Sequence, residues 1–363
     1  MSRLRVVVLF GGRSVEREVS RISARTIVSG LDPARYEVIP LAIAENGRFL
    51  TADASAGLLS SGPAPEKYRL PEAPAPGAQT LVPAEIGPGR ADVVFPIIHG
   101  TTGEDGALQG FLELLDIPYV GAGVTGSAIG MDKAVFKALV RDAGIPTPRA
   151  IVVSPGENEA KSARARLEKF GVSLPVFVKP SVGGSSVGVS KVKSWEALGP
   201  ALELAFRYDE RALVEDGIDA RELECAVLGN SEPRASIVGE VVPGREFYDY
   251  EDKYVEDRAK LLIPAPVPEA TAQEVRRLAV EAYRLCGISG MARVDFFLER
   301  GSNRVLLNEV NTLPGFTAIS MYPKLWEASG VPLRELLNEL IRLALERHER
   351  RGRLQHEPPK QLR

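Results

Sequence analysis

The residues best suited to chemistry lie in the stretch MARVDFFLERGSNRVLLNEVNTLPG, residues 291–315. Two runs of β-forming residues flank a Gly-Ser-Asn turn, which predicts an antiparallel pair of strands whose alternate residues share a face. Asp295 lies on the first run, and Glu309 and Asn311 lie on the second. Hard oxygen ligands without sulfur or imidazole suit Mg²⁺ or Mn²⁺ held beside phosphates. The alternative is a merely polar hairpin face, but the Asn-Thr-Leu-Pro-Gly turn that follows favours a metal–phosphate site.

A second candidate site begins at Lys179, at the end of an expected strand, and continues into the loop Pro-Ser-Val-Gly-Gly-Ser-Ser-Val-Gly, residues 180–188. Such loops wrap phosphates because backbone amides approach closely where no Cβ intervenes. The loop is not a Walker A sequence, since it lacks the Gly-Lys-Ser/Thr ending. A lysine on the strand before the loop resembles the kinase arrangement, and Lys133 is a second candidate for binding phosphate. The alternative is a hairpin loop that binds no ligand.

A third signal lies near the N-terminus, where an expected buried strand ends in Gly11-Gly12 and a helix begins close to Glu16. A strand, a tight turn and a helix start form a binding edge at the carboxyl end of a parallel sheet. Gly-Gly after a strand is often only a turn, and Glu16 could equally favour the helix dipole. This motif therefore indicates a binding site only in combination with the other two.

The elements that must position these groups form three units. An open parallel α/β sheet is expected in residues 1–121, a unit containing the glycine-rich loop in 122–216, and a unit containing the metal hairpin in 217–363. A Pro/Ala/Gly-rich segment at 60–90 is expected to be an irregular surface insertion. Strands are expected at 6–10, 36–44, 92–98, 150–153, 176–179, 188–192, 212–215, 222–228 and 236–242. Helices are expected at 17–30, 105–115, 126–143, 157–170, 195–206, 271–285 and 333–348.

Composition excludes several classes of function. The chain has 363 residues and a net charge of −3, which gives no reason to expect nucleic acid as a partner. No apolar run approaches the ~20 residues that span a bilayer, so no membrane partner is expected. The cysteines Cys225 and Cys286 lie in apolar contexts without metal-ligand spacing, which favours reduced thiols in the cytoplasm over a disulfide.

Together, the motifs resemble those of the ATP-grasp ligases, and specifically of D-alanine–D-alanine ligases. The resemblance covers nearly the whole chain in order, through GGRSVEREVS, HGTTGEDGALQGFLELLDIPYVGAG, MDK, VKPSVGGSSVGVSK, FYDYEDKY, GMARVDFF and NEVNTLPGFT. It implies an α/β fold, with α+β in the ATP-grasp part: an N-terminal open parallel sheet, followed by two ATP-grasp domains that enclose ATP.

The resemblance also implies a reaction. ATP phosphorylates the carboxylate of one D-alanine, and the amine of a second D-alanine then displaces phosphate to give the dipeptide for peptidoglycan precursor synthesis. Two Mg²⁺ or Mn²⁺ ions would be held by Asp295, Glu309 and Asn311. The residues implied to bind ATP are Lys133, Lys179, Glu215, Ile218, Glu222 and Lys253. Asp216 stands where many family members have lysine, which puts one contact near adenine in doubt.

On the substrate side, the resemblance implies that Glu16 and His99 anchor the ammonium region of the first D-alanine, although His99 could instead have a capping or core role. Arg293 would bind the developing anion, because a guanidinium fork suits that task. Gly315 would offer a backbone amide to the oxyanion, and Ser320 would bind the carboxylate of the second D-alanine.

A hydrogen-bonded triad, Glu16, Ser185 and Tyr254, is also implied, with the loop 245–260 acting as a lid that brings Lys253 to the phosphates. The family's D-lactate-using relatives have another residue in place of Tyr254, so this tyrosine favours dipeptide formation. A different ATP-grasp ligase and a catalytically inactive nucleotide-binding regulator are the competing hypotheses. Family members are commonly dimers through the N-terminal domain, and a homodimer is therefore expected.

Overall fold

The computed structural model describes residues 3–60, 83–87, 89–156, 158–243 and 260–355. Its first sheet is parallel, with strand order β2-β1-β3. The strands are β1 (Leu4–Gly11), β2 (Tyr36–Ile43) and β3 (Val93–Pro96). Helix α1 (Arg17–Gly30) packs on β1, and the helices α2 (Ala52–Ser60) and α3 (Ala107–Leu114) complete this part of the molecule. The parallel N-terminal sheet predicted from the sequence is therefore confirmed.

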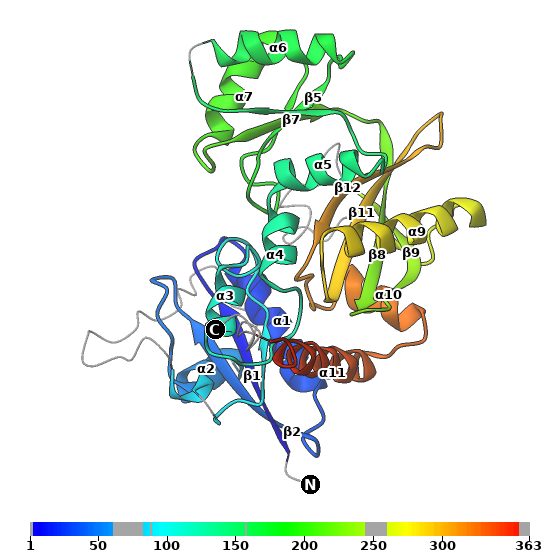
Figure 1. The fold of residues 1–363 in the computed structure, drawn as a ribbon. Helices are drawn as coiled ribbons and strands as arrows, with labels where there is room; N and C mark the ends of the chain where they lie inside the picture. Colours follow the sequence, from blue (N-terminus) through cyan, green and yellow to red (C-terminus); the bar gives the residue numbers. More distant parts are fainter. Residues whose placement is uncertain (1–2, 61–82, 88, 157, 244–259, 356–363) are drawn as a thin grey trace, which may run out of the picture.

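The second sheet is antiparallel, with order β4-β7-β5-β6, and it carries the glycine-rich loop between β5 and β6. Helices α6 (Glu159–Lys169) and α7 (Leu198–Ala205) cover one of its faces, as seen at the top of Figure 1. The short helix η2 (Trp195–Ala197) precedes α7. The strands are β4 (Ala150–Val153), β5 (Val176–Pro180), β6 (Ser190–Val192) and β7 (Ala212–Asp216).

The third sheet is also antiparallel, with order β10-β9-β8-β11-β12. Helix α9 (Glu269–Leu285) packs on one face and α10 (Met321–Ala328) contacts β8 and β9. The strands are β8 (Ala220–Gly229), β9 (Arg234–Val242), β10 (Lys260–Leu262), β11 (Gly290–Glu299) and β12 (Val305–Asn311). The pairing of β11 with β12 is the antiparallel hairpin that the sequence predicts.

Several expected elements differ from the observed ones, among them the following three. The helix expected at 126–143 is two helices, α4 (Val124–Met131) and α5 (Lys133–Asp142), because the Asp132 carboxylate accepts hydrogen bonds from two amides of α5 and caps a new helix. The segment 84–86 forms a short helical turn, η1 (Ala84–Ile86), although an irregular insertion was expected; residues 61–82 and 88 lie outside the described residues. Helix α11 (Leu333–Gly352) runs past the expected end at 348, where Arg353 donates to Glu349 at 2.5 Å.

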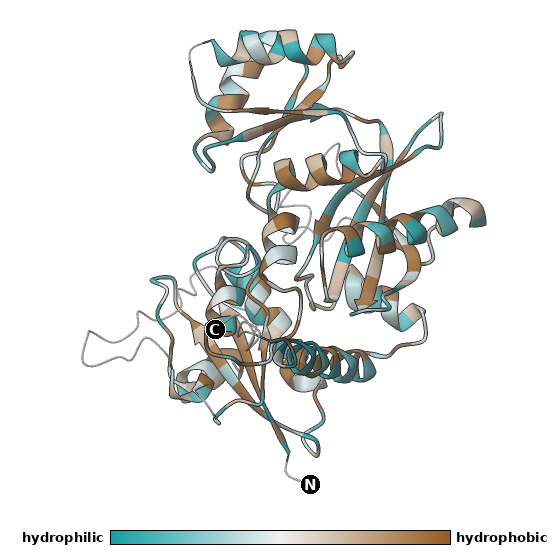
Figure 2. Cartoon of the chain, viewed as in Figure 1, coloured by the Kyte–Doolittle hydropathy of each residue, from teal (hydrophilic) through white to brown (hydrophobic). Residues whose placement is uncertain are grey.

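The buried side chains form several apolar cores. Figure 2 colours the ribbon by hydropathy, and the strands of the sheets include many hydrophobic residues, drawn in brown. One core joins the first sheet to α10, α11 and the third sheet, through residues such as Phe10, Phe316 and Leu337. A separate core lies within the second sheet and its helices, with Leu202 at its centre. Helix α5 contributes Phe136 to the core beneath the third sheet. No helix of the described residues is long and apolar enough to cross a membrane.

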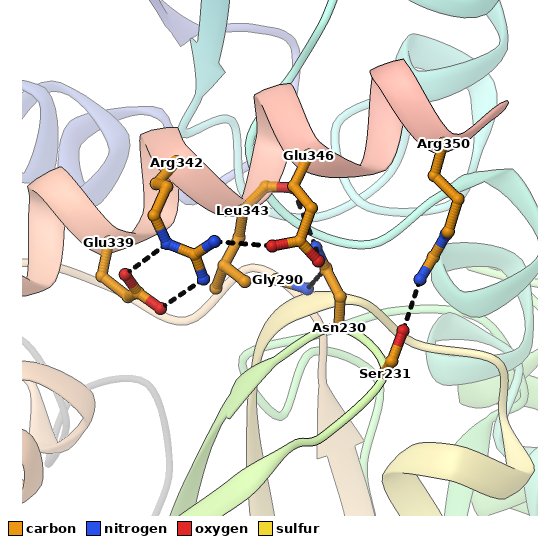
Figure 3. Close-up of polar contacts among 8 residues, drawn as sticks. All are labelled: Asn230, Ser231, Gly290, Glu339, Arg342, Leu343, Glu346 and Arg350. Atoms are coloured by element: carbon orange, nitrogen blue, oxygen red, sulfur yellow. Dashed lines mark hydrogen bonds and ion pairs between the residues drawn. The ribbon is translucent and has the colours of Figure 1, made fainter. Parts of the chain in front are cut away.

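Helix α11 is fastened to the third sheet by a polar cluster, shown in Figure 3. Asn230, at the turn after β8, donates to the carbonyl of Leu343 at 3.0 Å and to Glu346 at 3.2 Å. It also accepts from the amide of Gly290 at the start of β11, at 3.2 Å. A single amide side chain thus fixes the helix to two strands.

Candidate active site

A large cavity of about 810 Å³ opens between the three sheets. Every sequence-predicted site residue that the structure describes lines it: Glu16, His99, Lys133, Lys179, Ser185, Glu215, Ile218, Glu222, Arg293, Asp295, Glu309, Asn311, Gly315 and Ser320. Lys253 and Tyr254 were also predicted, and both lie outside the described residues. A cavity of this size can hold ligands the size of a nucleotide and small amino acids.

The β11–β12 hairpin brings the three predicted metal ligands to one face. Asp295 pairs directly with Glu309 in the register, and the Asn311 amide donates to Asp295 at 3.0 Å. Asn308 has no partner in this register, which marks a β-bulge. A bulge of this kind changes the direction of the neighbouring side chains. The buried Oδ1 of Asn308, which also lines the cavity, has no hydrogen-bond partner among the described residues.

This donor set fits a hard divalent cation. Two carboxylates and an amide supply oxygen ligands, as Mg²⁺ and Mn²⁺ prefer. The described residues contain no group of three or more His, Cys, Asp or Glu side chains arranged for a metal.

Arg293 lies between two carboxylates at the floor of the cavity. Its guanidinium donates to Asp295 at 2.8 and 2.7 Å, because alternate residues of β11 share a face. It also approaches Glu224, on the neighbouring strand β8, at 2.9 Å. Burial lowers the pKa of Arg293, but Asp295 and Glu224 outweigh this and raise it well above its usual value. The side chain is therefore a fixed cation with a defined orientation.

The glycine-rich loop is held against the start of α5. The Lys133 ammonium donates to the carbonyl of Gly183, and the Lys133 amide donates to the Ser181 carbonyl at 2.9 Å. The Ser181 hydroxyl donates to Asp132 at 2.7 Å, so the carboxylate that caps α5 also holds the first residues of the loop. Lys133 is thereby placed between the loop and the cavity.

Lys179 and Glu215 face each other across β5 and β7. Phe177 pairs with Glu215 in the register, so Lys179, two residues further along, lies diagonally on the same face. The Lys179 ammonium donates to Oε1 of Glu215 at 2.5 Å, and the ammonium of Lys137 lies 3.0 Å from Oε2. Although burial alone would raise the pKa of Glu215, the two lysines lower it to about 2.

Glu16 meets the glycine-rich loop from the opposite side. It occupies the N-cap position of α1, but its side chain makes no capping hydrogen bond. Instead its carboxylate accepts from the Ser185 hydroxyl. Ser185 and Ser186 both have positive φ values of 50° and 59°, a backbone conformation that turns the loop sharply here. Two of the three predicted triad members are thus in contact, while Tyr254 lies outside the described residues.

His99 and Glu104 form the end of the cavity nearest the first sheet. Burial lowers the pKa of His99, and its Nε2 has no hydrogen-bond partner among the described residues. Glu104 accepts from the amide of Gly100 at 2.9 Å. Burial, with the nearby charge of Glu16, raises the pKa of Glu104 to about 8. A buried imidazole nitrogen without a partner suits contact with a ligand better than a core role.

Gly315 and Ser320 lie together just before α10. A Cβ at Gly315 would come within 2.8 Å of the Ser320 Oγ, so a larger residue here would displace the Ser320 hydroxyl. The Ser320 hydroxyl accepts from the amide of Thr317 at 2.9 Å and lies 2.8 Å from its hydroxyl. The adjacent amide of Phe316 donates to Ser23 of α1 at 3.1 Å, which ties this turn to the first sheet.

The far end of the cavity is lined by Ile218 and Glu222, which come from the connection after β7 and from β8. Asp216, whose place in the family pattern puts one contact near adenine in doubt, accepts from Arg149 at 2.7 Å. The effect of Asp216 on adenine binding stays a prediction.

Sequence reasoning missed three charged residues of this region: Glu104, Lys137 and Glu224. Glu104 belongs to the quoted run HGTTGEDG, and an acid beside a glycine turn was a signal that could have been used. Lys137 lies four residues after Lys133, which places both on one face of α5. Glu224 becomes recognisable only when β8 is known to pair with β11, where it lies opposite Asp295.

Comparison with known proteins places the chain in a family. The family description "D-ala D-ala ligase N-terminus" matches residues 5–122, and "D-ala D-ala ligase C-terminus" matches residues 139–342. The chain belongs to the D-ala D-ala ligase family. The family assignment made from the sequence motifs is confirmed.

Individual members of the D-ala D-ala ligase family agree over nearly the full length. The chain is 48% identical to "D-alanine--D-alanine ligase" of Thermoanaerobacter sp. (strain X514), covering 97% of this chain and 99% of the relative. It is 47% identical to "D-alanine--D-alanine ligase A" of Escherichia coli (strain K12), covering 96% and 97%. The solved D-alanine-D-alanine ligase from Coxiella burnetii superposes with a TM-score of 0.83 at 38% identity, covering 97% of each chain.

Proposed function

We propose that the protein ligates two molecules of D-alanine to D-alanyl-D-alanine with consumption of ATP. The observation that supports this conclusion is the cavity, in which a chain of the D-ala D-ala ligase family gathers two lysines, a fixed arginine and a set of oxygen donors. An inactive regulator loses support because Arg293, Asp295, Glu309 and Asn311 are all present on the β11–β12 hairpin. A different ATP-grasp ligase loses support because the matching family descriptions are those of D-ala D-ala ligases.

The carboxylate of the first D-alanine is a poor electrophile, so it must be activated before an amine can attack it. The γ-phosphoryl group of ATP passes to a carboxylate oxygen of the first D-alanine, which gives ADP and D-alanyl phosphate. The amine of the second D-alanine attacks the acyl carbon, a C–N bond forms as the C–O bond to phosphate breaks, and the amine loses a proton. Splitting one difficult step into two easier ones is the reason for the acyl phosphate.

The residues of the cavity position these partners and neutralise charge. Lys133 and Lys179 are proposed to bind the phosphates, and Glu215, Ile218 and Glu222 the adenosine part. Two divalent ions, held by Asp295, Glu309 and Asn311, would neutralise charge on the transferring phosphoryl group when bound. We retain Lys253 as a further ATP-binding residue, although it lies outside the described residues.

On the substrate side, Arg293 is proposed to bind the anion that develops during attack. The guanidinium is held by Asp295 and Glu224, so it costs little reorganisation at the moment of reaction. Gly315 is proposed to donate its amide to the same anion, and Ser320 to bind the carboxylate of the second D-alanine. Glu16 and His99 would hold the first D-alanine, with Glu16, Ser185 and Tyr254 completing the triad over the site.

The remaining features of the proposal follow from the family. The product would supply peptidoglycan precursor synthesis in the cytoplasm, and the chain would act as a homodimer. We also propose the domain limits 1–121, 122–216 and 217–363. Sedimentation of the purified protein across a range of concentrations tests the homodimer.

The deciding experiment measures phosphate release from ATP and Mg²⁺ with D-alanine, with L-alanine, and with D-alanine plus excess D-lactate, and identifies products by mass. Turnover with D-alanine alone that yields the dipeptide is the expected result. A depsipeptide as the main product near neutral pH would overturn the choice of acceptor and the role of Tyr254. Protein that binds ATP but releases no phosphate with D-alanine would point to another ligase.

A further inference from the structure

Lys137 is a buried lysine that the proposed machinery does not use. Its side chain is only 6% exposed, and its ammonium lies 3.0 Å from Oε2 of Glu215. It also donates to the hydroxyl of Thr147 at 3.2 Å, and that hydroxyl donates to the carbonyl of Leu307 on β12 at 2.8 Å. Burying a long cation is costly unless it is paired, so this placement calls for an explanation.

The position of Lys137 follows from helix α5. Lys133 and Lys137 lie one turn apart on the same helical face. Lys133 reaches the carbonyl of Gly183 in the glycine-rich loop, whereas Lys137 reaches the carboxylate of Glu215 on β7. Of these two ammonium groups, that of Lys133 lines the cavity, whereas that of Lys137 pairs with Glu215.

The charges around Glu215 do not cancel. Its Oε1 accepts from Lys179 at 2.5 Å, and its Oε2 faces Lys137 at 3.0 Å. One carboxylate thus serves two ammonium groups, and the cluster carries one excess positive charge. Both lysines hold the pKa of Glu215 low, so the carboxylate stays ionised at neutral pH. Of the two lysines, Lys179 lines the cavity.

We infer that Lys137 is a positioning residue for the nucleotide: by occupying Oε2 of Glu215, it prevents that carboxylate from neutralising Lys179. Without Lys137, both oxygens of Glu215 would be available to Lys179, which would form a closed ion pair of no net charge. Lys179 would then attract the phosphates of ATP less strongly. The inference deepens the proposed function and rests on its use of ATP.

The first test compares Lys137→Met, which keeps the length of the side chain, with Lys161→Met, a control on the exposed face of α6. Binding of ADP with Mg²⁺ to the full-length chain is measured by calorimetry. Lys137→Met should weaken ADP binding by about tenfold, because close charge pairs of this kind have coupling energies of at least this size. The KM for ATP should rise in parallel while the KM for D-alanine stays within about twofold. Lys161→Met should match the wild type.

The second test separates this role from simple support of the fold. In the Glu215→Gln background no carboxylate is left to neutralise Lys179. Adding Lys137→Met there should therefore cost less than about threefold in ADP affinity, against about tenfold in the wild-type chain. Lys137→Arg keeps the charge and should bind ADP within about threefold of the wild type. If Lys137→Met does not fold, Lys137→Gln gives the same comparison, since it keeps a donor beside Glu215 but loses the charge.

Equal losses in the two backgrounds would overturn the inference, and so would Lys137→Met with wild-type affinity for ADP. These results are distinguishable from failure of the proposed function. A wild-type chain that neither binds ADP nor turns over ATP would overturn both. A wild-type chain that forms the dipeptide, with Lys137→Met unchanged in KM for ATP, would overturn the role of Lys137 alone.

Discussion

At the scale of single residues, the hydrogen bonds and ion pairs around each charged side chain determine its orientation in the site. Arg293 has carboxylates on both sides, from its own strand and from β8, so its guanidinium is fixed before any ligand arrives. Lysine has the same charge but cannot make two parallel hydrogen bonds to Asp295. Orientation is therefore as much a part of its proposed role as charge.

Replacing this residue by lysine tests that statement. Arg293→Lys should lower kcat for D-alanine-dependent phosphate release by roughly 100-fold, because an oriented donor to a developing anion is worth about this factor. The KM for ATP should change little, since the residue is proposed to act on the anion and not on the nucleotide. Circular dichroism of the variant serves as the folding control. A kcat within about threefold of the wild type would contradict the role.

Glu104 should make stability depend on pH. Burial and Glu16 raise its pKa from 4.5 to about 8, so the folded chain binds this proton more tightly than the unfolded chain. The stability that this group contributes is complete below pH 4.5 and is lost as the pH rises towards 8. Glu104→Gln removes the titration, and its Tm should exceed that of the wild type by roughly 2–4 °C at pH 8 but not at pH 5. Melting curves of ligand-free protein across this range check the prediction, and a Tm difference that is the same at both pH values would contradict it.

At the scale of elements, local patterns predicted most of the strands but missed helices α2 and α10 and the break between α4 and α5. The apolar run of β1 and the alternation of β11 and β12 are local signals, so the β11–β12 hairpin was predictable from period alone. The break at Asp132 interrupts no hydrophobic period, and so the sequence suggested one helix where two exist.

Contacts between elements that are far apart in the sequence could not be predicted from such local patterns. Lys137 meets Glu215 only because α5 packs beside β7, and Glu224 meets Arg293 only because β8 pairs with β11. Family resemblance supplied most of the proposed site, including Glu215 and Ser320, whose roles no local pattern could assign. Tyr254 and Lys253 lie outside the described residues, so their roles stay predictions.

Asp132 joins helix α5 to the start of the glycine-rich loop, so its replacement should weaken both the helix cap and this connection. Its carboxylate caps α5 through the amides of Ala134 and Val135, and it accepts from Ser181 and from Arg211, the latter at 2.5 Å. Asp132→Ala should lower the free energy of unfolding by about 1–2 kcal/mol through the lost cap alone. Urea denaturation measures the change, with Asp142→Ala at the exposed end of α5 as the matched control. Equal effects of the two substitutions would show that the cap contributes nothing.

At the scale of the whole molecule, the C-terminal helix links parts that are far apart in sequence. Arg347 of α11 donates to the carbonyls of Tyr119 and Gly121 at the end of the first unit, the former at 2.9 Å, and to Ser289 before β11 at 3.2 Å. Asn230 fastens the same helix to the third sheet (Figure 3). The first and third sheets should therefore behave as one body, which keeps Glu16 and Arg293 in register across the cavity.

The division into cores predicts how the molecule opens. Leu337 is fully buried in the core that the first sheet, α11 and the third sheet share, whereas Leu202 is fully buried in the core of the second sheet. Leucine to alanine at such sites costs about 2–5 kcal/mol. Leu337→Ala should speed amide hydrogen exchange in both β1 and β11, because losing the shared core loosens both sheets at once.

Leu202→Ala provides the matched comparison, since it removes the same atoms at equal burial from the other core. It should speed exchange in β4, β5 and β7 and leave β1 and β11 unchanged, because the second sheet makes its own core. The glycine-rich loop between β5 and β6 belongs to that sheet. The proposed phosphate-binding loop would then move with the second sheet, while the first and third sheets hold Arg293 and the β11–β12 hairpin in place. Exchange that rises in β1 with Leu202→Ala, or in β11 alone with Leu337→Ala, would contradict this division.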